Sequence, residues 1–163
     1  MNDDITPRHT RLEGTVDLET ALDTVIARAT HRLCIFDRAL DRRFDSARRH
    51  EMLRNFLAAN RANRLQIVLH DVDNLVRDCP RLLSLLRSRS GAITIHQTLP
   101  DAQGVYDPFT VADERDYVHR FHYEGTRSVL ALDDPHSARQ FVERFEEILG
   151  ASFPAVAANP LGL

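Results

Sequence analysis

Two short alternating segments in the last third of the chain constrain the fold more than any other feature. Phe109–Asp113 and Asp116–His122 change between apolar and polar residues with a period near two, and a polar Glu-Arg pair separates them. This pattern predicts a β-hairpin. Because successive side chains of a strand point to opposite faces of a sheet, His119 and His122 are predicted to lie on opposite faces.

The rest of the chain is predicted to supply more strands and covering helices. Short apolar runs predict strands at 32–37, 64–71, 92–96 and 128–133, with residues 10–13 extended at a sheet edge. Amphipathic stripes predict helices at 18–30, 46–60, 74–78, 80–89 and 135–149. Strands alternate with helices first and follow one another after residue 97. The predicted fold is therefore α/β, with a mixed sheet covered by helices on both faces.

Polar residues stand at the predicted helix starts, where a side chain can accept a backbone N–H. The candidate caps, in chain order, are Thr15 or Asp17, Asp45 or Ser46, Asp73, and Asp134 before Pro135. Three more polar residues, Asp37, His70 and Asp71, fall at the ends of predicted parallel strands, where open α/β sheets bind ligands. A turn-capping role is the favoured interpretation of the aspartates.

Length and composition indicate one globular domain. The chain has 163 residues, of which 43% are hydrophobic, enough to form a core without disulfides or metals. We expect a flexible leader at 1–13, a folded domain at 14–152 and a tail at 153–163. Cys34 and Cys79 belong to no ligand cluster, so buried free thiols are expected, with no metal site and no cofactor.

All 21 basic residues are arginines, which excludes every mechanism that needs a lysine, such as Schiff-base chemistry. Net charge is −3, so the molecule as a whole does not attract nucleic acid. Eight arginines fall between Arg38 and Arg64 but form no single helical stripe, which favours a solvated, ion-paired surface. No apolar run is long enough to span a membrane and no secretory signal is visible, so a cytoplasmic location is expected.

The order of these elements resembles one half of the phospholipase D-like fold. In that family a strand carries HxKxxxxD, a Gly-Ser-x-Asn segment follows, and a strand and a final helix close the half. Here the first strand reads YDPFTVAD, and EGTRSVLALDDPHSARQFVERF is similar to the closing strand and helix. The resemblance covers residues 11–150 and rests on the order of patterns.

The motif of that family is lost in this sequence. With Asp113 in the aspartate position, Tyr106 takes the histidine position and Pro108 takes the lysine position. The Gly-Ser-x-Asn positions fall on residues 120–123, which read RFHY. The family's reaction needs a histidine nucleophile, a second histidine as acid, and lysines on the phosphate. The resemblance therefore implies a degenerate member with no catalytic residue and a vestigial site at Tyr106, Asp113, Arg120 and His122.

The resemblance implies a non-catalytic binding or assembly module. Members of this size pair two identical halves, so a homodimer is expected. The candidate ligand contains phosphate, with Arg120 and His70 as anion contacts, because a guanidinium can bind phosphate in a bidentate manner. For Arg120, an ion pair with an acidic neighbour is an equal alternative, the neighbours being Asp113, Asp116 and Glu124.

Two other functions stay open from the sequence. One is a phosphodiesterase or nuclease with a rearranged site, which would use His119, His122 or His70 together with Arg120. The second is an arginine-rich nucleic-acid-binding protein that uses Arg38–Arg64. Shared metal binding by His119 and His122 is not expected, because strand geometry separates the two side chains.

Overall fold

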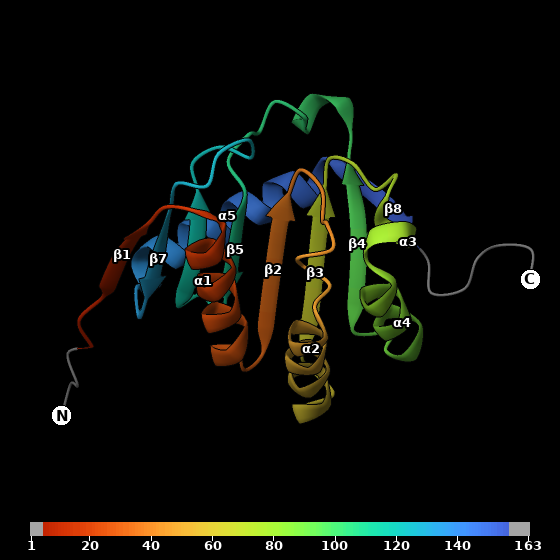
Figure 1. The fold of residues 1–163 in the computed structure, drawn as a ribbon, viewed down its shortest axis with the longest axis horizontal. Coiled ribbons are helices and arrows are strands. Elements are labelled where there is room, and N and C mark those ends of the chain that lie inside the picture. Colours follow the sequence, from red (N-terminus) through yellow and green to blue (C-terminus); the bar gives the residue numbers. More distant parts are fainter. Residues whose placement is uncertain (1–4, 157–163) are drawn as a thin grey trace, which may run out of the picture.

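The computed structural model describes residues 5–156 as one mixed sheet with helices on both faces (Figure 1). Its eight strands lie in the order β1-β7-β6-β5-β2-β3-β4-β8, which confirms the predicted fold class. The strands are β1 Arg8–Leu12, β2 Arg32–Asp37, β3 Arg64–Leu69, β4 Ile93–Thr98, β5 Phe109–Ala112, β6 Asp116–Arg120, β7 Ser128–Leu132 and β8 Ser152–Val156. The helices are α1 Thr15–Arg28, α2 Ala47–Ala59, α3 Leu75–Asp78, α4 Pro80–Ser88, the short 3-10 helix η1 Pro100–Ala102, and α5 Pro135–Gly150.

Strands β2, β3 and β4 form the parallel centre of the sheet. Helix α2 connects β2 to β3, and α3 with α4 connects β3 to β4. Because the chain runs back along a helix after each strand, the next strand starts at the same end as the previous one and is parallel to it. The C-terminal ends of these three strands lie together, at the top in Figure 1. We call this end of the sheet the upper end, and the opposite end, where these strands begin, the lower end.

The hairpin predicted from the alternating segments is present as β5 and β6. β5 runs antiparallel to β2, so Phe109 lies beside Phe36 at the upper end and Ala112 lies beside Leu33 at the lower end. β7 and β1 extend the antiparallel half outward from β6. The chain therefore brings the start of β5 next to the end of β2, where two strand directions meet.

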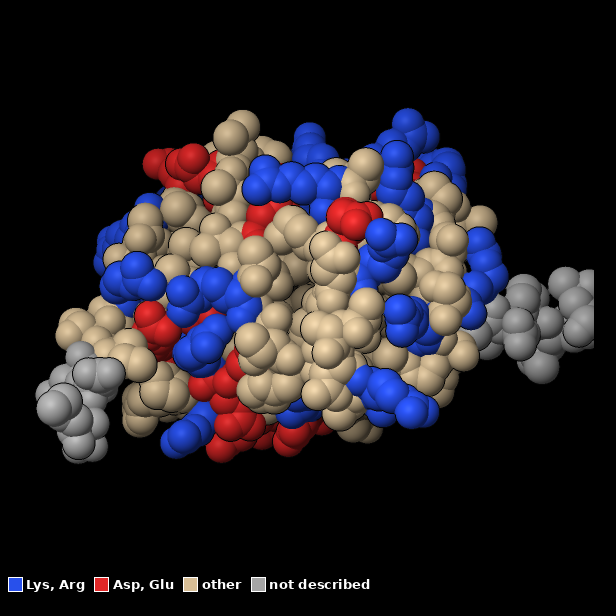
Figure 2. All heavy atoms as spheres, turned by 90° about the horizontal axis from the view of Figure 1, so that it is seen from below, with Lys and Arg blue, Asp and Glu red and all other residues tan. Residues whose placement is uncertain are grey.

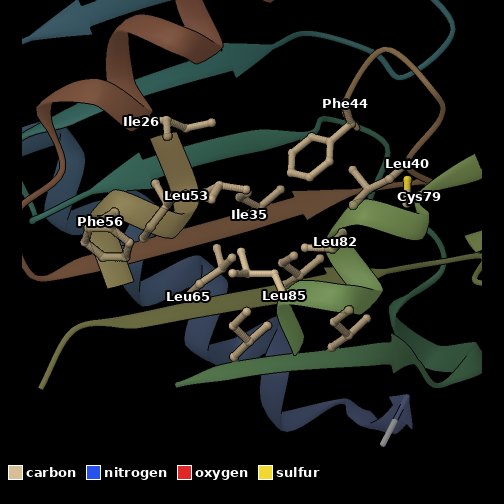
Figure 3. Close-up of a cluster of buried hydrophobic side chains, with 14 of the residues drawn as sticks. Ile26, Ile35, Leu40, Phe44, Leu53, Phe56, Leu65, Cys79, Leu82 and Leu85 are labelled. Atoms are coloured by element: carbon tan, nitrogen blue, oxygen red, sulfur yellow. The ribbon is translucent and has the colours of Figure 1, made fainter. Parts of the chain in front are cut away.

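Helices α1, α2 and α4 cover one face of the sheet. Alternate strand residues such as Ile35 and Leu65 point into this face and are buried. Figure 3 shows them beneath helix residues that include Ile26, Leu53 and Leu82. Apolar side chains spaced three and four apart along each helix give that stripe, and their removal from water stabilises the layer.

Helix α5 covers the other face alone. Asp134 accepts a hydrogen bond from the backbone N–H of Ser137 at 3.2 Å, and Pro135 begins the helix, both as predicted. Its buried stripe packs on the strand residues that point away from the first core. The strand residues of this second core are Cys34, Phe36, Val68, Phe109, Val111, Tyr117 and Ala131, and those of α5 are Ala138, Val142, Phe145 and Ile148.

Two predicted helix caps are wrong. α1 begins after Gly14, which has φ of 94°, a backbone conformation that glycine adopts without strain. No side chain caps α1, so neither Thr15 nor Asp17 takes the predicted role, and the Gly14 N–H donates to Thr126 Oγ1 at 3.1 Å. α3 begins after Asn74 rather than Asp73, and it has no side-chain cap.

Both residues considered as caps for α2, Ser46 and Asp45, accept hydrogen bonds from the backbone at the start of a helix. Ser46 caps α2 by accepting from the backbone N–H of Arg49 at 3.1 Å. Asp45 instead accepts from the N–H groups of Arg81 and Leu82 at 2.9 and 2.8 Å, in the first turn of α4. The loop after β2 therefore fixes the start of a helix that is distant in sequence.

Strand β8 was not predicted. It pairs antiparallel with β4, with Ser152 opposite Thr98, and all but its first residue fall in the stretch 153–163 expected to be a tail, of which residues 157–163 lie outside the described part of the chain. Its sequence, SFPAV, shows no alternation and contains a proline, which is tolerated on an edge strand. At the other edge of the sheet, β1 confirms the extended segment expected near residues 10–13.

Both cysteines are free and buried, as predicted. Burial raises the pKa of each thiol to about 12, so neither thiolate forms near neutral pH. Between residues 5 and 156, every helix is too short or too polar to cross a membrane.

Candidate functional site

A cleft of about 140 Å³ opens at the upper end of the sheet, where α1 meets the strands. Residues from the first half of α1 form one wall, the end of β2 and the loop after it form the floor, and the meeting point of β5 and β6 forms the other wall. The residues that matter most for its chemistry are Glu19, Asp37, Phe44, Pro108, Thr110 and Arg120. Such crevices beyond the ends of parallel strands are the usual ligand sites of open α/β sheets.

Asp37 is the last residue of β2 and is partly exposed in the cleft. Its Oδ1 accepts from the backbone N–H of Arg38 at 2.6 Å. Loss of hydration raises the pKa of Asp37 to about 6, although the positive charge of Arg120 acts in the opposite direction. The ion pairs beside it join Arg43 to Asp41 and Arg49 to Glu19, and none among the described residues includes Asp37.

Arg120, on the last position of β6, reaches the same cleft. Its Nε donates to the carbonyl of Gly125 and its Nη2 donates to the carbonyl of Tyr123. The guanidinium therefore closes the turn between β6 and β7. No described ion pair joins it to the acidic neighbours considered from the sequence, which are Asp113, Asp116 and Glu124.

Tyr106 and His122 lie against each other at the upper end. Their rings are stacked with centroids 5.3 Å apart, and Tyr106 is 55% exposed. The carbonyl of Tyr106 accepts from the N–H of Tyr123 at 2.9 Å, which ties the loop before β5 to the loop after β6. Arg38 lies over the Tyr123 ring at 5.2 Å from its centroid. Three of the four predicted site residues, Tyr106, Arg120 and His122, thus share one end of the sheet.

Pro108 occupies the position that the resemblance assigns to a lysine. It is buried in the wall of the cleft, and its carbonyl accepts from the N–H of Arg120 at 2.9 Å. A pyrrolidine ring carries no charge and no hydrogen-bond donor. The wall of the cleft therefore has an uncharged, apolar group at this position.

Asp113, the fourth predicted site residue, lies at the lower end and does not face the cleft. It follows β5 at φ of 57°, and its carboxylate accepts from the backbone N–H groups of Thr30, His31 and Arg32 at 2.7 to 2.9 Å. Burial opposes ionisation, but these donors outweigh it and lower the pKa of Asp113. Asp113 therefore fixes the loop between α1 and β2.

A buried ion network lies near Asp113 at the lower end. Asp116 is fully buried and accepts from Arg28 Nε at 2.9 Å and Arg115 Nη2 at 3.1 Å. Arg28 also donates to Asp133 at 2.8 Å, and the Asp133 N–H donates to Asp116 at 2.9 Å. Burial again opposes ionisation, and the hydrogen bonds, led by that of Arg28, lower the pKa of Asp116. Each charge in this network has a partner.

His70 directly follows β3 at the upper end of the sheet, and both of its ring nitrogens make hydrogen bonds. Its Nε2 lies 2.6 Å from the carbonyl of Val105, and its Nδ1 lies 2.7 Å from Thr98 Oγ1. A carbonyl can only accept, so Nε2 carries a proton and donates to it, while Nδ1 is paired with the hydroxyl. This arrangement holds the loop between β4 and β5 and leaves no free ring nitrogen for the anion contact expected from the sequence.

His119 lies on the face covered by α5, but β6 ends at Arg120, so the predicted strand alternation does not reach His122. Its Nε2 is 2.9 Å from Asp107, and Arg144 of α5 binds the same carboxylate with two hydrogen bonds of 2.8 Å. The histidines of the proposed rearranged enzyme, His70, His119 and His122, thus lie in three separate environments. In the described part of the chain, no group of three His, Cys, Asp or Glu residues is placed to hold a metal ion.

The arginines between Arg38 and Arg64 are divided among different tasks. Arg49 is buried and binds Asp23 at 2.9 Å, whereas Arg54 pairs with Glu51 on the surface. Figure 2, which shows the lower end, has basic side chains interrupted by acidic and uncharged ones. Described ion pairs hold Arg42, Arg43, Arg49 and Arg54, so the interpretation of an ion-paired surface applies to part of this segment.

Residues 15–158 match the family described as a Domain of unknown function (DUF7931). No curated protein matches the chain. Among solved structures, it is similar to the phospholipase D family member nuc from Salmonella typhimurium, with 13% identity, a TM-score of 0.66, and coverage of 93% of this chain and 100% of that one. It is also similar to NucT from Helicobacter pylori, with 11% identity, a TM-score of 0.58, and coverage of 92% and 100%.

A further similar structure is TrmBL2, described as an archaeal chromatin protein with a novel mode of DNA binding. The identity is 14% and the TM-score is 0.65. The match covers 94% of this chain, which spans 57% of the length of TrmBL2. These likenesses show a shared fold, and they bear out the phospholipase D-like architecture expected from the order of the elements.

Proposed function

Because the chain belongs to the family described as a Domain of unknown function (DUF7931) and has the fold of a phospholipase D family member, we propose that it is a non-catalytic binding or assembly module. The cleft at the upper end is its binding site. The protein presents this site on a rigid sheet, since three buried parallel strands hold the floor of the cleft in place.

The occupants of the cleft wall carry this proposal. The reaction of the phospholipase D-like family needs an imidazole nucleophile and a cation at positions that hold Tyr106 and Pro108 in this chain. A phenol is mostly protonated near pH 7, and proline provides no charge. Arg120 lines the same cleft as Pro108, and its donors are directed at backbone carbonyls. Nothing in this arrangement supplies a nucleophile together with a phosphate grip.

Assembly is supported by exposed apolar side chains at the upper end of the sheet. Tyr106 and Phe121 are 55% and 45% exposed at the upper end, and Leu99 is exposed in the neighbouring loop. Large apolar side chains that cluster on a surface mark interaction sites. We propose that two copies join through this end, since twofold pairs are the most common protein oligomers.

Turnover of a generic phosphodiester tests the loss of catalysis. We expect no hydrolysis of bis-p-nitrophenyl phosphate above the buffer rate, with or without EDTA. His122→Ala is the informative variant, and His136→Ala, an exposed histidine at the start of α5, is the matched control. Turnover that His122→Ala abolishes and His136→Ala retains would overturn the proposal in favour of an enzyme.

Sedimentation velocity tests the assembly. We expect the wild-type chain to sediment as a dimer, and Tyr106→Glu combined with Phe121→Glu to sediment as a monomer, because two charges would be buried in the interface. Phe153→Glu, at an exposed aromatic on β8, is the control and should stay dimeric. A monomeric wild-type chain would contradict the assembly part of the proposal.

A further inference from the structure

The charged side chains around the cleft do not give the surplus of positive charge that favours binding of a phosphate. Arg49 is almost fully buried, with its side chain 2% exposed, and it lies between two carboxylates, Glu19 at 2.8 Å and Asp23 at 2.9 Å. One guanidinium thus faces two carboxylates, which leaves one negative charge in surplus beside the cleft. Arg43 and Asp41 form an exposed pair at 3.5 Å and cancel each other.

Asp37 and Arg120 are the remaining charged groups. Arg120 makes its described hydrogen bonds to the carbonyls of Tyr123 and Gly125, whereas Asp37 binds only the backbone N–H of its neighbour Arg38. The side-chain carboxylate at the floor of the cleft therefore lacks a bound cation. Its remaining oxygen can accept a hydrogen bond from a ligand.

The walls of the cleft combine polar and apolar side chains, and the apolar ones come from three segments. Leu18 and Leu22 contribute from α1, Phe44 and Leu40 contribute from the loop after β2, and Pro108 contributes from the opposite wall. Figure 3 shows Leu40 and Phe44 over the end of β2. A carboxylate set among apolar side chains matches a ligand that has one charged group on an apolar body. The volume of about 140 Å³ admits a compact ligand.

We propose that the cleft binds a compact organic cation, an amine, amidine or guanidine with an apolar body, whose charged head lies against the Asp37 carboxylate. This inference rests on the proposed binding function and deepens it by naming the class of ligand. A charge-assisted hydrogen bond from the ligand to Asp37 would replace the water that the carboxylate loses on burial. The apolar body would cover Phe44 and Leu40.

An anionic ligand fits the same cleft poorly. A phosphate would lie close to Asp37 and near the surplus charge of the Glu19 and Asp23 pair, and Arg120 is the one cation lining the cleft that has no described ion pair. Like charges at short range in a partly dry cleft repel strongly.

The pH dependence of binding follows from the groups around Asp37. Arg120 on β6 lowers its pKa, while Asp41 in the loop and Glu19 on α1 raise it, and loss of hydration is the largest effect. Arg43 and Arg49 also line the cleft but are paired. Since the pKa is about 6, most of Asp37 is protonated at pH 5. Affinity for a cation should fall about tenfold between pH 7.5 and pH 5.

Isothermal titration calorimetry with benzamidinium tests the proposal. We expect saturable binding at pH 7.5, binding at least about tenfold weaker for neutral benzamide, and no binding of inorganic phosphate. Asp37→Asn should weaken benzamidinium binding at least about tenfold. Asp101→Asn, which removes an exposed carboxylate outside the cleft, should change it less than about twofold.

Three outcomes would overturn the inference. They are equal affinity for benzamide and benzamidinium, binding of phosphate that benzamidinium does not displace, and an unchanged affinity in a folded Asp37→Asn variant. If that variant does not fold, the tenfold pH dependence of the wild-type chain decides in its place. Failure here leaves the turnover and sedimentation results untouched, so the wider proposal stands or falls separately.

Discussion

The two ends of the sheet use the same residue types, arginine and aspartate, in opposite ways. At the lower end, Asp116 is fully buried and binds both Arg28 and Arg115. At the upper end, Asp37 and Arg120 share a cleft but each binds backbone groups instead of a side chain. The comparison teaches that partners, and not residue types, separate a structural cluster from a binding site.

The pKa values of the carboxylates record the same difference. At the lower end, hydrogen bonds lower the pKa of Asp113 and Asp116 in spite of burial. At the upper end, loss of hydration raises the pKa of Asp37 to about 6. Lower-end carboxylates therefore stabilise the fold when ionised, whereas ionised Asp37 costs stability until a ligand binds.

The largest expected effect comes from the lower end. Asp116→Ala should destabilise the chain by about 3 kcal/mol, because it leaves two guanidinium groups without their buried partner. Urea unfolding at pH 7.5 measures the change. Asp37→Asn is the matched variant from the upper end, and a loss of stability there as large as in Asp116→Ala would contradict the comparison.

Asp113→Ala should cause the next largest loss of stability. It removes the acceptor for the N–H groups of Thr30, His31 and Arg32, and a loss of about 2 kcal/mol is expected for a part-buried site. Glu114→Ala controls for the backbone, since Glu114 also has positive φ, at 51°. Similar losses for both variants in urea unfolding would assign the effect to the turn conformation instead of the hydrogen bonds.

Asp37→Asn should raise stability at pH 7.5 by about 1 kcal/mol, since it removes a charge from a poorly hydrated place that solvent still reaches in part. The pKa of Asp37 is raised, so the folded chain binds more protons than the unfolded chain between about pH 4 and 6. The stability supplied by this group is therefore greatest below about pH 4, falls through that window, and is constant above it.

Thermal melting of the wild type and of Asp37→Asn across pH 4 to 8 measures this contribution of Asp37 to stability. The melting temperature of Asp37→Asn should exceed that of the wild type by an amount that grows from pH 4 to pH 6 and then levels off. Lower-end carboxylates behave in the opposite sense, because stability from a lowered pKa is lost as pH falls below the ordinary range near 4. A difference that shrinks from pH 4 to pH 6 would show that Asp37 is stabilised as a charge.

The smallest expected effect is at the rim of the cleft. Arg43 and Asp41 form an exposed pair at 3.5 Å, so Arg43→Gln should change stability by less than about 0.5 kcal/mol. Urea unfolding should show overlapping curves for the variant and the wild type. A larger loss would indicate that the rim contributes structure, and the two ends would then be more alike than proposed.

The sequence was sufficient for the sheet and most of its covering helices. The hairpin at β5 and β6 and the start of α5 at Asp134 are local patterns, and both are confirmed. β8 was missed because its pairing with β4 is set by distant packing and its five residues carry no period. The Gly14 start of α1 was missed for a similar reason, since its N–H binds Thr126 far along the chain.

The candidate site was predicted in part. Of the four predicted site residues, Arg120 lines the cleft, and Tyr106 and His122 lie at the same end of the sheet. Asp113 was grouped with them because the motif of the family includes an aspartate, although seven extended residues after Tyr106 carry it to the other end of the sheet. The importance of Asp37 for the cleft was also not visible in the sequence. It depends on the nearby charge of Arg120 and on the absence of an ion pair to Asp37 among the described residues.

The central claim is that the upper end of this phospholipase D-like sheet binds a ligand without handling phosphate. A crystal structure grown with benzamidinium and inorganic phosphate present together tests it most directly. The account predicts benzamidinium in the cleft with its charged head on Asp37, and no phosphate there. Phosphate held between His122 and Arg120, with Asp37 turned away, would contradict it.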